Sequence, residues 1–348
     1  MGTSRTAPNA LNRDLRLAVA DLETVNPWMG VYRFSILGIV FLGLVALAWT
    51  APNMAGFLGY TAIAGIFYAF WLICTHDATH HTLTGWAWFD EGAPRLISWP
   101  MVWPYGAYSY LHHLHHAWNG IDLRDPERVQ WAIAEYQQAP PWQQWYVRHQ
   151  WWIDLFVLGG LGLIAKTTLH ALRLKSQTPV LQRHLWLDGL GILVVQASLT
   201  LIAIGHHRLL DYILFWIVLE RVIGILLQTR DHLEHYALWG STAGHQLTQL
   251  YACRNLDTHP VMAWLMGGLN DHAVHHAFPS IPFNHLPEAF CRTTAILQQH
   301  GWPPLLREQG YLQETLRLGS RPCLIGAPQP ADPTGRYHMI SCHDLKLT

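Results

Sequence analysis

Four short segments gather more than half of the 23 histidines in the sequence. On an α-helix, residues at positions i, i+3 and i+4 share one face. Three segments have this spacing: His76 and His80 in HDATH, His112, His115 and His116 in HHLHH, and His272, His275 and His276 in HAVHH. Because imidazole is the commonest metal ligand in proteins, these eight side chains predict a metal centre.

The fourth segment, TRDHLEHYAL, adds Asp231 and His235, which lie four residues apart and therefore share a helical face. His235 is the predicted ninth ligand. His232 lies three residues before it and could use the same face instead. His81 and His113 lie off the shared faces, so we expect them behind the ligands or at the surface.

The number of histidines indicates which metal they bind. Imidazole suits zinc, copper, iron and nickel, but a tetrahedral zinc ion takes only four ligands. Eight or nine ligands therefore predict two metal ions, and redox-active iron fits best. A zinc membrane hydrolase would hold one ion with an open position for water. A zinc transporter would need ligands at mid-membrane, whereas these segments lie at the ends of apolar stretches or outside them.

The composition is typical of a membrane protein, because only 13% of the residues are charged and 51% are hydrophobic, against roughly 25% charged in soluble domains. Apolar segments at 34–49, 54–74, 189–205 and 212–228 approach the ~20 residues of a membrane-spanning helix. They pair into two hairpins. Segment 151–165 is short and begins with tryptophans and an aspartate, so it suits an interfacial or re-entrant helix.

Glu220 and Arg221 lie inside the fourth apolar segment, where charges are costly in lipid. Adjacent residues point about 100° apart on a helix. We therefore expect the two side chains to bond other helices rather than each other.

The distribution of positive charge predicts the orientation in the membrane. The stretch 75–185 between the hairpins carries eight Lys and Arg, whereas the turns inside the hairpins carry only Arg208. The positive-inside rule then places the histidine segments on the cytoplasmic side. We expect a multi-pass protein of a bacterial inner membrane, with its active site facing the cytoplasm. A net charge of -1 offers no basic surface for nucleic acid.

The predicted fold is all-α. It is an integral membrane bundle of four transmembrane helices in two hairpins, with a cytosolic helical cap that carries the histidine segments. Its predicted parts are a cytosolic N-terminal segment (1–30), the membrane domain (31–302) and an irregular cytosolic C-terminal extension (303–348) that contains many Gly and Pro.

The histidine segments resemble the three histidine boxes of the membrane fatty acid desaturase and hydroxylase superfamily. Those boxes read H-x(3,4)-H, H-x(2,3)-H-H and [HQ]-x-x-H-H, and the segments from His76, His112 and His272 are similar to them in that order. The stretches GGLN and HHAFPSIPFNHLPE also resemble the residues around the third box. The resemblance covers about residues 30–290. The third box departs from the common form N-x-x-x-E-H-H-L at Asp271, Val274 and Ala277.

The resemblance implies a diiron centre near the membrane face, with a substrate tunnel below it. The implied ligands are His76, His80, His112, His115, His116, His235, His272, His275 and His276. Asp231 would lie near one iron. Asn119, Asp122 and Asp125, in the polar run NGIDLRDPE, could hold ligating rings by accepting their second N–H, and Asn270 is a further candidate. Asp122 or Asp125 could equally be a helix cap.

The resemblance also implies the chemistry. Breaking an unactivated C–H bond is beyond acid–base catalysis, so O2 as co-substrate and iron are required. We expect an oxidoreductase that introduces a double bond into the acyl chain of a fatty acid or lipid. Carotenoid hydroxylases or ketolases, alkane or fatty acid hydroxylases, and decarboxylases that form terminal alkenes belong to the same superfamily and stay open.

The electrons must come from another protein. The sequence has no H-P-G-G motif of a fused cytochrome b5, and no cysteine set that could hold an iron–sulfur cluster. We expect a ferredoxin, a rubredoxin or a cytochrome b5-like donor to dock on the cytosolic face.

Overall fold

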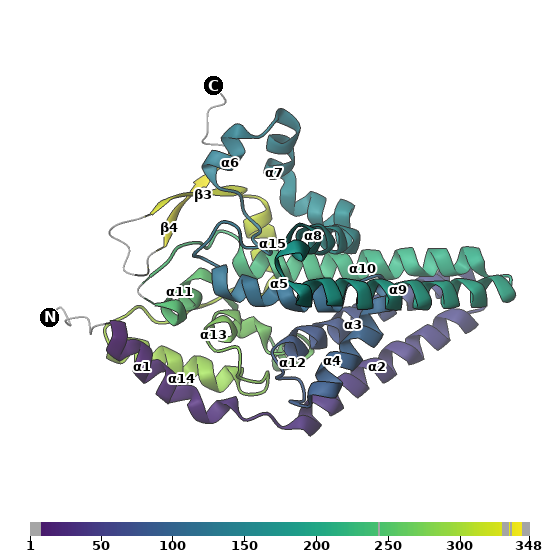
Figure 1. Ribbon diagram of the computed structural model, residues 1–348, viewed down its shortest axis with the longest axis horizontal. Coiled ribbons are helices and arrows are strands. Elements are labelled where there is room, and N and C mark those ends of the chain that lie inside the picture. The colour runs from purple at the N-terminus through teal and green to yellow at the C-terminus, as the bar shows by residue number, and fades with distance from the viewer. Residues whose placement is uncertain (1–7, 243, 329–333, 335, 343–348) are drawn as a thin grey trace. The chain divides into compact units, whose positions relative to one another are not determined.

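The structure is a computed structural model that describes residues 8–242, 244–328, 334 and 336–342 (Figure 1). It is helical almost throughout, which confirms the predicted all-α class. The chain divides into two compact units. Unit 1 contains Met1–Val25, Leu114–Ile153 and Thr229–Thr348, and unit 2 contains Asn26–His113 and Asp154–Gln228.

Two long helices of unit 2, α2 (Pro27–Thr50) and α3 (Met54–Thr79), form the first predicted hairpin. Asn26 and Asn53 precede them. The side-chain oxygen of each accepts a hydrogen bond from a backbone N–H of the first turn, at 3.1 and 2.8 Å. These caps satisfy amides that a helix start leaves without an intrahelical partner. Local sequence therefore sets where both helices begin.

The second hairpin consists of α9 (Pro179–Gly205) and α10 (Leu209–His235), whose last residues, from Thr229, belong to unit 1. Tyr212 Oη donates a hydrogen bond to Gln196 Oε1 at 3.0 Å and links the two helices. The predicted segments 189–205 and 212–228 are thus both helical.

Among the described residues, four helical segments are long and apolar enough to cross a membrane: α2, α3, Pro141–Leu174 and α9. Four spans were also predicted, but one of the four helical segments is not among the predicted ones. Pro141–Leu174 is one of the four, although 151–165 was expected to be an interfacial segment. A π-helical turn, η3 (Asp154–Leu158), joins its two parts into a helical run of 34 residues. The predicted span 212–228 lies in α10, with Glu220 and Arg221 at its middle.

The expected bonds from Glu220 and Arg221 to other helical segments are present, but the two side chains also pair with each other, which was not expected. Arg221 Nη2 lies 2.9 Å from Glu220 Oε2, because two long side chains can bridge the angle between neighbouring positions. Both also bond outside α10. Glu220 Oε1 accepts from Leu161 N at 2.7 Å, and Arg221 Nη1 donates to Val157 O at 2.8 Å. The pair therefore ties α10 to the π turn and to α8 (Gly159–Leu174).

A glycine makes this approach possible. A Cβ atom on Gly224 of α10 would lie 1.9 Å from the backbone nitrogen of Gly160. The two backbones touch directly, as small residues allow in membrane helix pairs.

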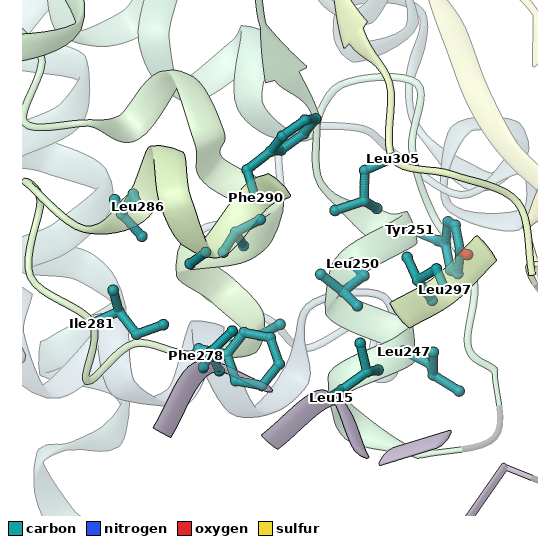
Figure 2. Close-up of a cluster of buried hydrophobic side chains, with 14 of the residues drawn as sticks. Leu15, Leu247, Leu250, Tyr251, Phe278, Ile281, Leu286, Phe290, Leu297 and Leu305 are labelled. Atoms are coloured by element: carbon teal, nitrogen blue, oxygen red, sulfur yellow. The ribbon is translucent and has the colours of Figure 1, made fainter. Parts of the chain in front are cut away.

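Unit 1 is built around the third histidine segment. Helix α13 (His272–Ala277), which carries it, packs against α11 (His245–Ala252) and α14 (Leu286–Gln299), and α14 packs against α1 (Pro8–Val19). Apolar side chains from these elements form one core (Figure 2), which includes Leu11, Leu15, Leu247, Leu250, Val274, Phe278, Leu286 and Leu297. All six residues of α13 are buried, so this core holds the histidine backbone rigidly.

Helix α5 (Tyr105–Trp118) carries the second histidine segment and contributes to both units, with the division after His113. The remaining helices are α4 (Ala87–Ser98), α6 (Ile133–Gln138), α7 (Pro141–Ile153) and α12 (Pro260–Leu265). Short 3-10 turns are η1 (Ala20–Glu23), η2 (Trp99–Met101), η4 (Lys175–Gln177) and η5 (Leu269–Asp271).

The C-terminal stretch 303–348, expected to be irregular, contains regular structure in its described part. Strand β2 (Arg307–Glu308) pairs in parallel with β1 (Asn255–Leu256), and α15 (Tyr311–Gly319) follows. Strands β3 (Cys323–Pro328) and β4 (Tyr337–Ser341) form an antiparallel hairpin. Leu324 and Ile325 of β3 are buried in separate apolar clusters, so the apolar run CLI packs as a strand rather than as a loop.

Candidate metal centre

Three predicted ligands lie together in unit 2. His76 and His80, from the end of α3, and His112, from α5, have ring centroids 4.7 to 5.3 Å apart. One ring nitrogen of each lies within 4.8 Å of the others. We call these three residues the first cluster.

The carboxylate of Asp188 anchors the helix that supplies His112. It accepts a hydrogen bond from the backbone N–H of Gly106, in the first turn of α5, at 2.7 Å. A Cβ atom on Gly106 would lie 2.5 Å from His184 Nδ1, so a larger residue at this position would force the His184 side chain to move. The start of α5 is thus fixed against α9.

A buried ion pair supports the first cluster. Arg33 Nη1 lies 2.6 Å from Asp77 Oδ2, and both side chains are buried. Asp77 Oδ1 is 3.4 Å from His76 Nδ1. The sequence offered a signal for both residues, since Arg33 is the only charged residue of α2 and Asp77 lies inside HDATH. Neither was predicted to have a role.

Four further predicted ligands meet in unit 1: His115 of α5, His235 of α10, and His272 and His276 of α13. We call these four residues the second cluster. His235 Nε2 lies 3.2 Å from His115 Nε2 and 3.0 Å from His272 Nε2. The ring of His276 lies 4.5 to 5.0 Å from the other three. Imidazole nitrogens bound to one ion at about 2.1 Å are roughly 3 Å apart, so this spacing fits a bound metal.

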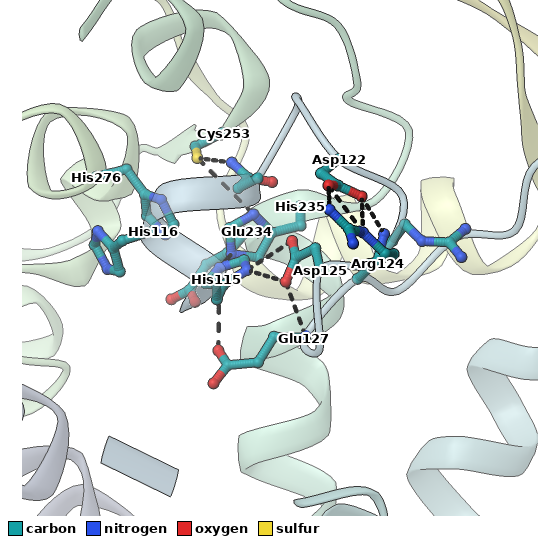
Figure 3. Close-up of polar contacts among 12 residues, drawn as sticks. His115, His116, Asp122, Arg124, Asp125, Glu127, Glu234, His235, Cys253 and His276 are labelled. Carbon is teal, nitrogen blue, oxygen red and sulfur yellow. Dashed lines mark hydrogen bonds and ion pairs between the residues drawn. The ribbon is translucent and has the colours of Figure 1, made fainter. Parts of the chain in front are cut away.

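The rear nitrogens of three of these rings have partners (Figure 3). His115 Nδ1 lies 2.9 Å from both carboxylate oxygens of Asp125. His276 Nδ1 lies 3.0 Å from Gln249 Oε1, and His235 Nδ1 lies 3.8 Å from Cys253 Sγ. An acceptor behind Nδ1 holds a hydrogen there and turns Nε2 towards the metal, as in many metal sites.

The buried atom His276 Nε2 has no hydrogen-bond partner among the residues that the structure describes. A buried polar atom without a partner costs about 1–3 kcal/mol. A metal ion at the point where the rings converge would satisfy it. The second cluster therefore fits a metal in both geometry and hydrogen bonding.

Asn119 acts on the second cluster through other side chains. The side-chain Nδ2 of Asn119 donates to Gln249 Oε1 at 3.0 Å and to Cys253 Sγ at 3.1 Å. The backbone carbonyl of Asn119 accepts from Gln249 Nε2 at 3.0 Å. It thereby fixes the two groups behind His276 and His235. Sequence reasoning missed Gln249 and Cys253, because no spacing relates them to the histidines.

His116 and His275, the other two predicted ligands, lie beside the second cluster in unit 1. Their ring centroids are 5.0 Å apart. His116 also stacks on His276, with a centroid distance of 4.0 Å and an interplanar angle of 7°.

Charge around the second cluster favours a cation. Burial acts to lower the pKa of His115, but Asp125 and Glu127 outweigh burial and raise this pKa to about 9. Burial raises the pKa of Glu234 to about 8 and lowers the pKa values of His272 and His276 well below the usual value. The rings of His272 and His276 are therefore in the neutral form that binds metals. The carboxylates of Asp125 and Glu127 attract positive charge to the same place.

Three predicted residues point elsewhere. Asp122 accepts from Arg124, with Nη2 at 2.6 Å, and not from an imidazole. His81 and His113 are exposed, as expected for positions off the shared faces, and His113 Nδ1 lies 2.7 Å from Ser109 O.

His232 is the alternative to His235 as a predicted ligand. The ring of His232 lies 5.0 Å from that of Trp151 and 6.4 Å from that of Tyr236, in an aromatic environment. Asp231 is half-buried, and its charge contributes to the raised pKa of His115.

Asn270 is buried and hydrogen-bonds the carboxylate of Asp271. Arg307 pairs with the same carboxylate at 2.8 and 3.0 Å. Asn270 therefore helps to hold the start of α13.

A cavity of about 710 Å³ lies among the helices of unit 2. Its wall is mainly apolar and includes Phe41, Leu42, Val45, Tyr68, Trp71, Ile97, Met101, Leu199, Ala203, Phe215, Trp216 and Leu219. Helix α3 carries Tyr68 and Trp71 on the cavity wall and His76 in the next turns. Helix α3 of unit 2 thus contributes both to the wall of this apolar cavity and to the first cluster.

Comparison with known proteins agrees with the site. The family model described as fatty acid desaturase matches residues 51–305. The chain is 24% identical over 242 residues to a Delta(9) fatty acid conjugase-like enzyme of Dimorphotheca sinuata, and the alignment covers 63% of each chain. It is 22% identical over 165 residues to an sn-1 oleoyl-lipid 12-desaturase of Arthrospira platensis, covering 43% of this chain and 46% of that protein. The chain thus spans less than two thirds of either relative.

Proposed function

Because the chain belongs to the fatty acid desaturase family, we propose that it removes two hydrogens from adjacent carbons of a lipid acyl chain and leaves a double bond. The balance of the reaction is one acyl chain, one O2, two electrons and two protons giving one unsaturated chain and two waters. The electrons come from an external carrier.

The observation that carries this proposal is the arrangement of the two histidine clusters. We assign one iron ion to each, with His116 and His275 completing the ligand set of nine. Helix α5 supplies a ligand to each cluster. Bound iron supplies the O2-dependent oxidation that acid–base groups cannot perform.

The chain's own residues have three tasks. The rear partners Asp125, Gln249 and Cys253 orient the ligating rings. The apolar cavity binds the acyl chain and excludes water from it. The helices α2, α3 and α9, with Pro141–Leu174, hold the protein in the membrane where lipid substrates are found. The names of both relatives refer to fatty acyl or lipid substrates, which supports this substrate class.

Sidedness and the electron donor belong to the same proposal. The excess of Lys and Arg between the hairpins supports an active site on the cytoplasmic face of a bacterial inner membrane. A ferredoxin, a rubredoxin or a cytochrome b5-like protein would deliver the electrons there.

Lipid profiling by mass spectrometry tests the proposal. Cells that express the protein with a suitable reductase should accumulate acyl chains that have lost two hydrogens, whereas gain of one oxygen would indicate hydroxylation instead. The purified protein should contain iron, and both His115→Ala and His275→Ala should lower its iron content. A protein that contains one zinc ion and no iron would refute the proposal.

A further inference from the structure

Two carboxylates face the metal-binding side of the second cluster. Glu234 Oε2 lies 3.5 Å from His272 Nε2, and Glu127 Oε2 lies 4.0 Å from His115 Nε2. These are the Nε2 atoms that converge with His235 Nε2. Each of these carboxylate oxygens thus lies near a ring nitrogen of the second cluster.

Glu234 is the better placed of the two. Its side chain is 3% exposed, against 19% for that of Glu127. A buried carboxylate costs several kcal/mol unless opposite charge and hydrogen bonds compensate it. Arg230 Nε lies 3.5 Å from Glu234 Oε1, which is beyond the range of a good hydrogen bond. Within the described residues Oε1 accepts no hydrogen bond, so a cation close to Glu234 would complete the compensation.

The other buried guanidinium near Glu234 is engaged with backbone groups. Arg254 donates to the carbonyls of Leu233 and Tyr236, the latter at 2.9 Å. Its backbone N–H also donates to Glu234 O at 2.9 Å. These bonds hold the last turn of α10 and leave the Glu234 carboxylate facing His272.

The carboxylate near the first cluster has a different position and a different partner. This carboxylate, that of Asp77, lies behind a ring, 3.4 Å from His76 Nδ1, and is paired with Arg33 at 2.6 Å. The negative charge of Asp77 is therefore already balanced. The carboxyl group of Glu234 lies on the side of the ring nitrogens instead, with Oε2 3.5 Å from His272 Nε2.

We propose that Glu234 is an oxygen ligand of the metal ion in the second cluster. His235, His272 and Glu234 then form the two-histidine, one-carboxylate donor set that is typical of non-haem iron with open positions. The inference rests on the proposed diiron function. A Glu234 ligand would make the two metal ions differ in their ligand charge, because only the ion in the second cluster would have an anionic ligand. Such a ligand stabilises the higher charge of oxidised iron.

Metal titration of the full-length protein in detergent, with Fe(II) or Co(II) and without oxygen, tests this assignment. Glu234→Gln keeps the shape of the side chain and removes its charge. Loss of an outer partner weakens metal binding roughly 10–100-fold, so loss of a ligand should weaken one of the two sites by about 100-fold or more. The Co(II) absorption bands of that site should shift. Glu234→Asp should restore binding in part.

A matched control is Glu314→Gln. The Glu314 side chain is buried to a similar degree, with 4% exposed against 3% for Glu234, but it pairs with Arg317 on α15. This variant should bind both ions as the wild type does. Thermal unfolding of the metal-free proteins checks that each variant folds. If Glu234→Gln does not fold, Glu234→Asp carries the test, because its shorter carboxylate must still shift the Co(II) bands.

Two results would overturn the inference. One is a Glu234→Gln protein that binds both ions with wild-type affinity. The other is weaker binding with unchanged Co(II) bands, since Glu234 would then only position His272. If the wild type binds no iron, the proposed function fails instead, so the two failures are distinguishable.

Discussion

Removing the charge of Asp125 should weaken metal binding at the second cluster. Both oxygens of Asp125 lie 2.9 Å from His115 Nδ1, and the two side chains are 0% and 1% exposed. Asp125→Asn keeps an acceptor behind the ring but loses the charge. Buried hydrogen bonds to charged groups contribute about 1.5–3 kcal/mol, which corresponds to about 10–150-fold in affinity. Outer partners of metal ligands have a similar effect, roughly 10–100-fold.

The assay is a competitive titration of Fe(II) against a coloured chelator, without oxygen. Asp122→Asn is the control, because Asp122 lies in the same loop but pairs with the exposed side chain of Arg124. The expected result is one weakened site in Asp125→Asn and unchanged binding in Asp122→Asn. Equal binding curves for Asp125→Asn and the wild type would refute the reasoning, and so would an equal loss in both variants.

Three further predictions concern the cavity and the helices. Ala203→Phe places a phenyl ring in the cavity that Ala203 lines. If this ring takes the place of about four methylene groups of the bound acyl chain, each worth ~0.8 kcal/mol of burial, the variant should prefer shorter acyl chains by about 200-fold. Lipid profiling measures this preference, and Leu201→Phe, at a position that is 67% exposed, should leave the profile unchanged. Gly224→Ala should lower the melting temperature in detergent, because its Cβ would lie 1.9 Å from the backbone nitrogen of Gly160. The control Gly43→Ala, with nothing within 4 Å of its Cβ, should instead stabilise its helix by up to about 1 kcal/mol. Equal melting temperatures of the two variants would contradict the close helix contact. Arg33→Met should destabilise the fold by about 3–5 kcal/mol in thermal unfolding because it leaves a buried carboxylate without its cation, and a loss below about 1 kcal/mol would rule out that role.

Helix spacing made much of the site predictable. The i, i+3 and i+4 rule grouped His112 with His115 and His116, and α5 is indeed one helix through all of them. The apolar segments at 34–49 and 54–74 lie in α2 and α3, since a long uncharged run in a membrane protein has few alternatives to a helix. The nine-histidine ligand set stays a prediction.

Other expectations depended on packing and were less accurate. Glu220 and Arg221 pair with each other and also bond the π turn and the start of α8, two elements that no spacing along the chain places beside α10. The stretch 303–348 holds a helix and a hairpin because its short apolar runs find buried partners in unit 1.

The sequence by itself determined which imidazoles share a helical face, because the 3.6-residue repeat of the helix is a local property. Only the tertiary structure decided what lies behind and between those imidazoles. Gln249 and Asn119 are 130 residues apart and still hydrogen-bond next to the same ring. Glu234 faces His272 only because α10 and α13 meet in unit 1. Such contacts form between surfaces that folding brings together, and no spacing along the chain encodes them.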